Sequence, residues 1–244
     1  MSGGPRVALV TGGAVRVGRA IVTHLAARGW AVAFTYWGSA AQAQELANEL
    51  DAAGHACLPL SADLDSPKDC RAIVDTTLER FGRLDALVNN AGVFPRTPLA
   101  DLDEAAFLAV LQTNLIAPVM LAKLAAPALG AVGGGIVNIV DILAARPIRH
   151  HLAYIVSKAG LAAATRTLAV ELAPAVRVNA IAPGIALFPD GYDDETRRRL
   201  IAQTLLGRAG TPEEVARTVE YLLDGAPTMT GQVLTLDAGR SVPL

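Results

Sequence analysis

The chain has 244 residues and a formal net charge of −2, and its core must be aliphatic because hydrophobic residues make up 52% but aromatics only 5%. So small a charge excludes bulk attraction to nucleic acid or to an acidic membrane. Cys57 and Cys70 stand apart without a paired motif, which argues against a metal site or a disulfide framework. Because Met1 to Pro5 leaves no room for a secretory signal before the first strand, we expect a cytoplasmic protein with no membrane segment.

Short β-branched runs alternate with longer amphipathic stretches, which is typical of a parallel sheet with helices on both faces. Strands are predicted over 6–11, 31–36, 56–61, 84–89, 135–140, 176–181 and 232–236. Helices are predicted over 16–28, 40–53, 67–80, 102–128, 151–172 and 212–224. No linker or repeat divides the chain. The predicted fold is therefore a single α/β domain over 1–244, with a doubly wound parallel sheet of about seven strands.

Two stretches need separate comment. The segment 184–211 is the longest without a clear strand pattern, and we expect it to form a mobile lid over a substrate. Arg197-Arg198-Arg199 within it is interpreted as a solvated helix face. The stretch 115–132 comes nearest to a membrane span, but Lys123 and the breakers around it argue against one.

A glycine-rich turn stands between the first predicted strand and the first predicted helix, with the sequence Thr11-Gly12-Gly13-Ala14-Val15-Arg16-Val17-Gly18. Such a turn lets the backbone approach a pyrophosphate while the helix N-terminus directs its free N–H groups at it. The first 44 residues contain no Asp or Glu, which also favours an anionic ligand. Arg16 occupies the place where a middle glycine is common, so the spacing departs from the usual one.

The end of the second strand indicates which dinucleotide binds. A carboxylate there would accept hydrogen bonds from the adenosine ribose and favour NAD, whereas its absence removes a repulsion against the extra phosphate of NADP. This chain reads Tyr36-Trp37-Gly38-Ser39, and the nearest downstream acid is Glu45. NADPH is the favoured cofactor over NADH, with Ser39 as a phosphate ligand.

Tyr154 and Lys158 stand four residues apart and share one face of a helix. A cation beside a phenol favours phenolate, so we expect Lys158 to lower the pKa of Tyr154 toward acid–base work at neutral pH.

With the glycine turn, Asn89-Asn90-Ala91-Gly92, Tyr154/Lys158 and Pro183-Gly184 in this order, the chain resembles the short-chain dehydrogenase/reductase family over nearly its whole length. The resemblance implies a Rossmann fold and a homo-oligomer, either a tetramer or a dimer. It implies that Lys158 binds the nicotinamide ribose and that Asn114 belongs to a water relay leading to Lys158. On local sequence alone, Asn114 is also interpreted as a solvated helix position and Asp63 as a cap. The cofactor residues that the resemblance implies are Gly12, Arg16, Val17, Gly18, Tyr36, Ser39, Asp63, Leu64, Asn90, Ala91, Gly92, Tyr154, Lys158, Pro183, Gly184 and Ile185.

One departure sets this chain apart within the family. Asp141 stands where the family usually carries a serine that orients a carbonyl, and it resembles the pteridine reductase branch in this respect. A carboxylate beside a phenolate is repelled, so Asp141 should be protonated or face a basic substrate nitrogen. Arg16 and Phe94 also resemble that branch, which implies that Phe94 sandwiches a flat pterin, although an ordinary rim aromatic is the other interpretation.

These residues predict NADPH-dependent reduction of a pterin-like small molecule, with Asn114, Asp141, Tyr154 and Lys158 as the catalytic set and Arg16, Phe94, Asp141 and Tyr154 at the substrate. Two other hypotheses stay open. A carbonyl reductase, such as a 3-oxoacyl thioester reductase, would use the same fold, and a non-catalytic NADP-binding sensor would keep only the pocket.

Overall fold

The computed structural model describes residues 4–188 and 191–242, which form one α/β domain around a central sheet. Seven strands pair in parallel in the order β3-β2-β1-β4-β5-β6-β7. The prediction of a single-domain, doubly wound parallel sheet is confirmed. The strands are β1 (Val7–Val10), β2 (Ala31–Tyr36), β3 (Cys57–Ser61), β4 (Ala86–Asn89), β5 (Gly135–Ile139), β6 (Arg177–Pro183) and β7 (Val233–Leu236).

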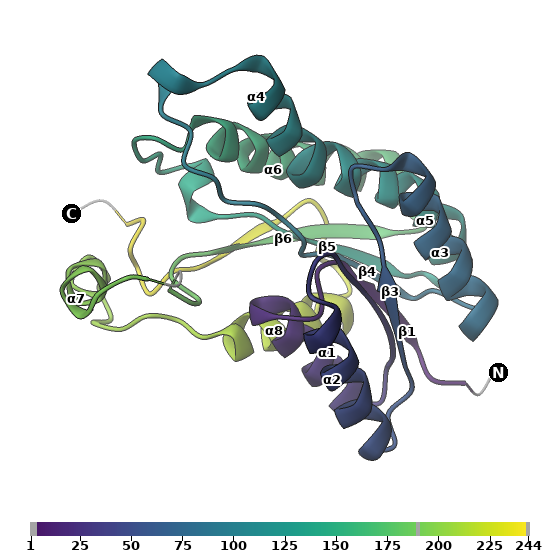
Figure 1. Ribbon diagram of the computed structural model, residues 1–244. Coiled ribbons are helices and arrows are strands. Elements are labelled where there is room, and N and C mark those ends of the chain that lie inside the picture. The colour runs from purple at the N-terminus through teal and green to yellow at the C-terminus, as the bar shows by residue number, and fades with distance from the viewer. Residues whose placement is uncertain (1–3, 189–190, 243–244) are drawn as a thin grey trace.

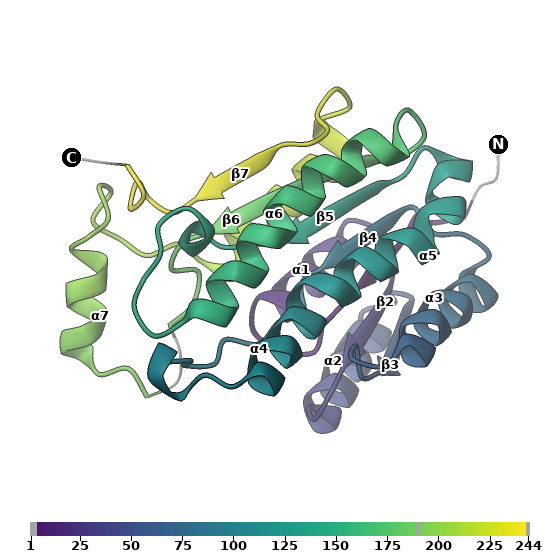
Figure 2. The ribbon, with the colours of Figure 1, turned by 90° about the horizontal axis from the view of Figure 1, so that it is seen from above.

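Helices cover both faces of this sheet (Figure 1). On one face lie α1 (Arg16–Ala27), α2 (Ala40–Ala52) and α8 (Pro212–Glu220), which continues as a π-turn over Tyr221–Gly225. On the other lie α3 (Pro67–Phe81), α4 (Glu104–Leu111), α5 (Ala117–Val132) and α6 (Leu152–Leu172). Figure 2 shows α5 and α6 running across that face, side by side. Because each face buries its own aliphatic core, the strands read as nearly continuous apolar runs.

Two elements differ from the sequence expectation. The predicted helix 102–128 is α4 and α5 joined by a π-helical turn over Gln112–Ile116, and it continues to Val132. A further short helix, α7 (Asp194–Ile201), stands inside the segment that had no clear pattern. Residues 189 and 190 of that segment lie outside the described residues.

The stretch Glu104–Val132 is long and apolar enough to cross a membrane, judged by length and composition alone. In this fold one side of it belongs to the core, because Leu121, Ala125 and Leu129 are fully buried against the sheet. Its apolar composition is therefore partly accounted for by packing.

Candidate active site

Parallel strands bring their carboxyl ends to one edge of the sheet, and a large cavity opens there. Its volume is about 720 Å³, and it crosses the point where β1 is flanked by β2 on one side and β4 on the other. Nearly every predicted site residue lines it: Gly12, Arg16, Val17, Gly18, Tyr36, Ser39, Asp63, Leu64, Asn90, Ala91, Gly92, Phe94, Asp141, Tyr154, Lys158, Pro183 and Gly184. Asn114 and Ile185 are not among the lining residues.

The glycine turn is packed so closely that two of its glycines leave no room for a side chain. A Cβ on Gly18 would lie 2.0 Å from the carbonyl oxygen of Gly12, and a Cβ on Gly13 would lie 2.6 Å from the side-chain Cβ of Phe34. Val15 occupies the N-cap of α1 and has no side-chain oxygen to satisfy the first amides of the helix. These amides and the positive end of the helix dipole are therefore available to an anion in the cavity.

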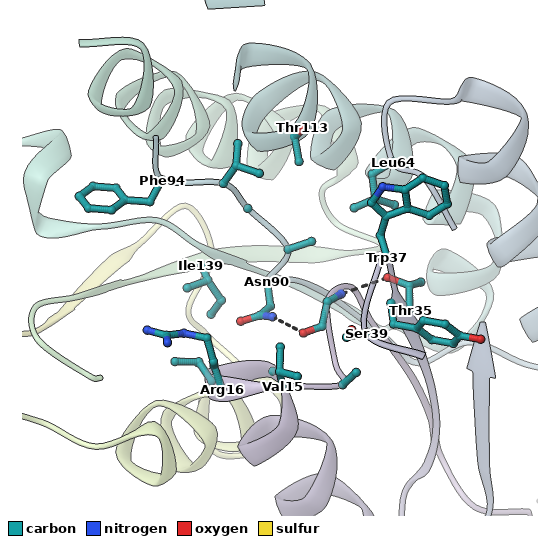
Figure 3. Close-up of a pocket in the computed structure, with 18 of the residues that line it drawn as sticks. Val15, Arg16, Thr35, Trp37, Ser39, Leu64, Asn90, Phe94, Thr113 and Ile139 are labelled. Atoms are coloured by element: carbon teal, nitrogen blue, oxygen red, sulfur yellow. Dashed lines mark hydrogen bonds between the residues drawn. The ribbon is translucent and has the colours of Figure 1, made fainter. Parts of the chain in front are cut away.

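A threonine that the sequence analysis missed fixes the turn to the next strand. The hydroxyl of Thr11 accepts hydrogen bonds from the amides of Asn90 and Ala91, both at 3.0 Å. The Asn90 side chain donates back to the Thr11 carbonyl at 2.9 Å and to the Gly12 carbonyl at 3.0 Å, and Figure 3 shows the second of these hydrogen bonds. Gly12 in turn donates to Thr35 Oγ1 at 3.0 Å. The floor of the cavity is thus held by side chains from β1, β2 and the end of β4.

The two ends of the cavity differ in character. Figure 3 shows Trp37 and Leu64 at one end and Phe94 at the other, with Asn90 between them. Trp37 is 69% exposed, so its indole is available to a flat ligand such as adenine. The sequence analysis placed Ser39 here but passed over Trp37, although an exposed tryptophan at a strand end is a signal for ligand contact.

At the other end, Tyr154 and Asp141 form a direct pair. The Tyr154 hydroxyl donates to Asp141 Oδ2 at 2.7 Å, and Asp141 Oδ1 accepts from the amide of Leu143 at 2.8 Å. Burial raises the pKa of Asp141 despite these hydrogen bonds. Burial and the neighbouring carboxylate also raise the pKa of Tyr154 well above its usual value. The expectation that Lys158 lowers the pKa of Tyr154 in the free protein is therefore wrong, because desolvation and Asp141 outweigh the cation.

Lys158 is a fully buried cation behind that pair. Its Nζ lies 6.0 Å from the centroid of the Tyr154 ring and donates to the carbonyl of Ile139 at 2.8 Å. Burial lowers the pKa of Lys158 to about 8, although the charge of Asp141 opposes this shift. Near neutral pH the ammonium form still predominates, and it can hold a ribose hydroxyl in the cavity.

Asn114 is fully buried, so the interpretation of a solvated helix position is wrong, while its place in a water relay to Lys158 stays a prediction. It lies in the π-turn, where its side chain exchanges hydrogen bonds with the backbone of Val93 at 2.8 and 2.9 Å and donates to Ser157 Oγ at 3.1 Å. Ser157 donates in turn to the Tyr154 carbonyl at 2.6 Å. Asn114 therefore fixes the loop after β4 to the helix that carries Tyr154. Gly92 lies close to both Asn114 and Lys158, since a Cβ on Gly92 would be 3.1 Å from Asn114 Oδ1 and 3.4 Å from Lys158 Nζ.

An aromatic cluster packs against the ring of Tyr154. Phe94 is 42% exposed, meets Tyr154 edge-on at 4.5 Å, and stacks on His151 with the ring centroids 4.3 Å apart and the planes 4° from parallel. His151 is itself held by a 3.0 Å contact between Nδ1 and the Pro95 carbonyl. The sequence analysis missed His151, which lies three residues before Tyr154 and fixes the plane of Phe94.

The fold and this site define a dinucleotide-binding protein of the Rossmann type with an acid–base pair at one end of the cavity. Residues 13–241 match a family model described as enoyl-(acyl carrier protein) reductase. The cis-4-hydroxycyclohexanecarboxylate dehydrogenase of Sinomonas cyclohexanicum is 38% identical over 241 residues, which are 96% of each chain. The 3-oxoacyl-[acyl-carrier-protein] reductase FabG of Staphylococcus aureus is 32% identical, over 95% of this chain and 96% of that one.

Among solved structures, FolM alternative dihydrofolate reductase 1 from Brucella canis, complexed with NADP, is 36% identical with a TM-score of 0.90. The alignment covers 98% of this chain and 95% of that one. The chain belongs to the short-chain dehydrogenase/reductase family, and it is an oxidoreductase.

Proposed function

We propose that this protein is an NADPH-dependent reductase of a pterin or dihydropteridine, and that it reduces a C=N bond with Tyr154 as the proton donor. The observation that carries the proposal is the 2.7 Å hydrogen bond from Tyr154 to Asp141. A carboxyl group at this position suits a substrate with basic ring nitrogens, because it can share a proton with one of them. Phe94 offers an exposed ring face against which a flat heterocycle can stack.

The cavity fits the dinucleotide that this proposal requires. The compressed glycine turn and the uncapped start of α1 suit a pyrophosphate, Trp37 and Leu64 suit the adenine, and Lys158 suits the nicotinamide ribose. The absence of an acid at 36–39 and the hydroxyl of Ser39 support NADPH over NADH. When bound, the cofactor supplies the hydride that reduces the substrate carbon.

The protein residues then handle the proton. Tyr154 donates its proton to the substrate nitrogen, directly or through water, and the resulting phenolate is stabilised by the buried ammonium of Lys158. Asp141 supplies a proton to Tyr154 across their hydrogen bond, since the raised pKa of Asp141 keeps its protonated form accessible. Phe94, which is backed by His151, stacks on the pterin ring and holds it in the plane needed for hydride transfer from the cofactor.

The test follows the absorbance of NADPH with dihydrobiopterin and with dihydrofolate as substrates. We expect oxidation that depends on Tyr154 and is lost in Tyr154→Phe. No oxidation with either compound would overturn the pterin assignment. Oxidation of NADPH in the same assay with a ketone as substrate would then favour the hypothesis of a carbonyl reductase.

A carbonyl reductase is that second hypothesis, and the names of the curated relatives favour it. Asp141→Ser distinguishes the two, because serine at this position donates to a carbonyl oxygen and carries no charge. Gain of ketone reduction in this variant would support an ancestral role as a carbonyl reductase. Unchanged pterin turnover would show that the carboxyl group of Asp141 is dispensable.

Two further expectations belong to this proposal. We expect the segment 184–211 to act as a substrate lid, since Phe188 already contacts Arg16 at 3.4 Å. We also expect a homo-oligomer, a dimer or a tetramer, which light scattering on a size-exclusion column would measure.

A further inference from the structure

The loop that carries Phe94 is tied down on either side of this residue. Before it, the backbone N–H and C=O of Val93 both bond to the Asn114 side chain, at 2.8 and 2.9 Å. After it, the carbonyl of Pro95 lies 3.0 Å from Nδ1 of His151. Because a carbonyl oxygen only accepts, Nδ1 of His151 must carry a proton and donate it. His151 therefore holds the chain one residue beyond Phe94.

The imidazole of His151 also covers the ring of Phe94 directly. The two centroids are 4.3 Å apart and the planes are 4° from parallel, so one face of Phe94 lies against the imidazole. Tyr154 meets the same ring edge-on, with the centroids 4.5 Å apart. Phe94 still keeps 42% of its surface exposed, and it lines the cavity (Figure 3). Since the ring cannot turn without losing its stacked contact, His151 sets the orientation that Phe94 presents to a ligand.

The backbone just before His151 adopts an unfavourable conformation. His150 has a φ of 68°, in the left-handed region that residues with a side chain disfavour. Its carbonyl accepts a hydrogen bond from the Thr97 amide at 2.6 Å, and Thr97 pairs with His151 in an isolated parallel bridge. His151 is also the N-cap of α6, the helix that carries Tyr154, but its side chain makes no capping hydrogen bond to that helix. The strained turn therefore directs the imidazole toward Phe94 and away from the helix amides.

We infer that His151 is a positioning residue, which makes the cavity selective for flat substrates by holding Phe94 in one orientation. A flat ring gains affinity from a stacking surface that is already in place, whereas a saturated ring has no π face to stack on it. The side chain of His151 bonds to Pro95 and stacks on Phe94, while the Tyr154 hydroxyl bonds to Asp141, so proton transfer should not depend on His151. The inference rests on the proposed reduction at this cavity, but not on a pterin as its substrate.

Three variants separate the stacked contact from the hydrogen bond. His151→Ala removes both, whereas His151→Phe keeps a ring that can stack and His151→Asn keeps an N–H donor on a short side chain. In His151→Ala we expect KM for dihydrobiopterin to rise about ten-fold, the loss of one aromatic contact. The kcat for dihydrobiopterin and both constants for cyclohexanone should stay unchanged. His151→Phe should recover most of the lost affinity, and His151→Asn only a minor part.

The matched control is His55→Ala, the same substitution before the amino end of β3, at the edge of the sheet opposite the cavity. It should leave all constants in place. Equal rises in KM for both substrates, an unchanged KM in His151→Ala, or no recovery in His151→Phe would overturn the inference. Failure of the pterin proposal looks different, because dihydrobiopterin would then be inert. In that case acetophenone, a flat ketone, replaces it in the comparison with cyclohexanone and still reports on His151.

Two further measurements need no turnover. Long-range proton–nitrogen NMR in mildly alkaline buffer should place the imidazole proton of His151 on Nδ1, and a proton on Nε2 would overturn the hydrogen bond to Pro95. Calorimetry with biopterin on the NADP⁺-loaded protein should show binding about ten-fold weaker in His151→Ala and restored in His151→Phe. Equal affinity of these two variants and the unchanged protein would overturn the selectivity.

Discussion

At the scale of single residues, the proposed chemistry depends on the protonation states of three buried groups, Tyr154, Asp141 and Lys158. Desolvation raises the pKa of both acids and lowers that of Lys158, so all three shifts favour neutral forms. A bound substrate nitrogen and a ribose would change this balance by supplying new hydrogen-bond partners. In the free protein these shifts thus favour the protonated forms of the two proposed proton donors, Tyr154 and Asp141.

Tyr154→Phe removes the proposed proton donor while keeping the ring that packs on Phe94. We expect kcat to fall by a factor on the order of 100 to 10,000, the usual contribution of general acid catalysis. Binding of NADPH, measured by calorimetry, should be retained. Turnover close to that of the unchanged protein would contradict the role of the hydroxyl.

Asp141→Asn tests the electrostatic coupling between Asp141 and Lys158. The Asp141 carboxylate raises the pKa of Lys158, which burial lowers to about 8, so its removal should lower that pKa further. Activity that needs the ammonium is lost as pH rises through this pKa. We therefore expect the alkaline limb of the kcat/KM profile to move to lower pH. Asp103→Asn, at the N-cap of α4, is a control that keeps a good cap and should leave the profile in place.

At the scale of elements, the glycine turn and the π-turn determine where the reacting groups lie. In Gly18→Ala the new Cβ would meet the Gly12 carbonyl at 2.0 Å, so the turn must open. We expect loss of NADPH binding and a decrease of about 1 to 3 kcal/mol in the free energy of unfolding. Chemical denaturation and calorimetry measure the two effects.

The control for that variant is Gly130→Ala in α5, where the nearest contact of a Cβ is an ordinary 3.5 Å. Since alanine is the better helix former, stability should be unchanged or higher by up to about 1 kcal/mol. Loss of cofactor binding in this control would show that the effect of Gly18→Ala is unspecific.

The sequence predicted the strands and helices because apolar runs and glycine breakers mark their ends, as at β2, whose predicted and observed limits agree. It could not show that Asn114 lies in a π-turn and bonds to Val93, because that partner is set by tertiary packing. Nor could spacing show that Asp141 raises the pKa of Tyr154, which needs both the 2.7 Å contact and the burial. His151 was missed because no motif marks its position against Phe94.

At the scale of the whole molecule, a ligand that binds only the folded chain must stabilise it. At a concentration one hundred times its Kd, NADPH should add about 2.7 kcal/mol. We expect a clear rise in Tm with NADPH and a smaller one with NADH at equal concentration, measured by calorimetric scanning. Ser39→Asp places a carboxylate near the expected phosphate, so it should reduce the NADPH effect and preserve or increase that of NADH. An NADH effect larger than that of NADPH in the unchanged protein would contradict the proposed cofactor.

The sheet also separates the two ends of the described chain. Gly4 precedes β1 at the amino edge of the sheet, whereas Val242 follows β7 on the side to which the carboxyl ends of the strands point (Figure 1). A fusion partner attached after Val242 would therefore start on the side of the sheet where the cavity opens, and one attached before Gly4 would start on the opposite side. Kinetic work is therefore best done with amino-terminal tags, since a polyhistidine tail on the cavity side would add charge near the site.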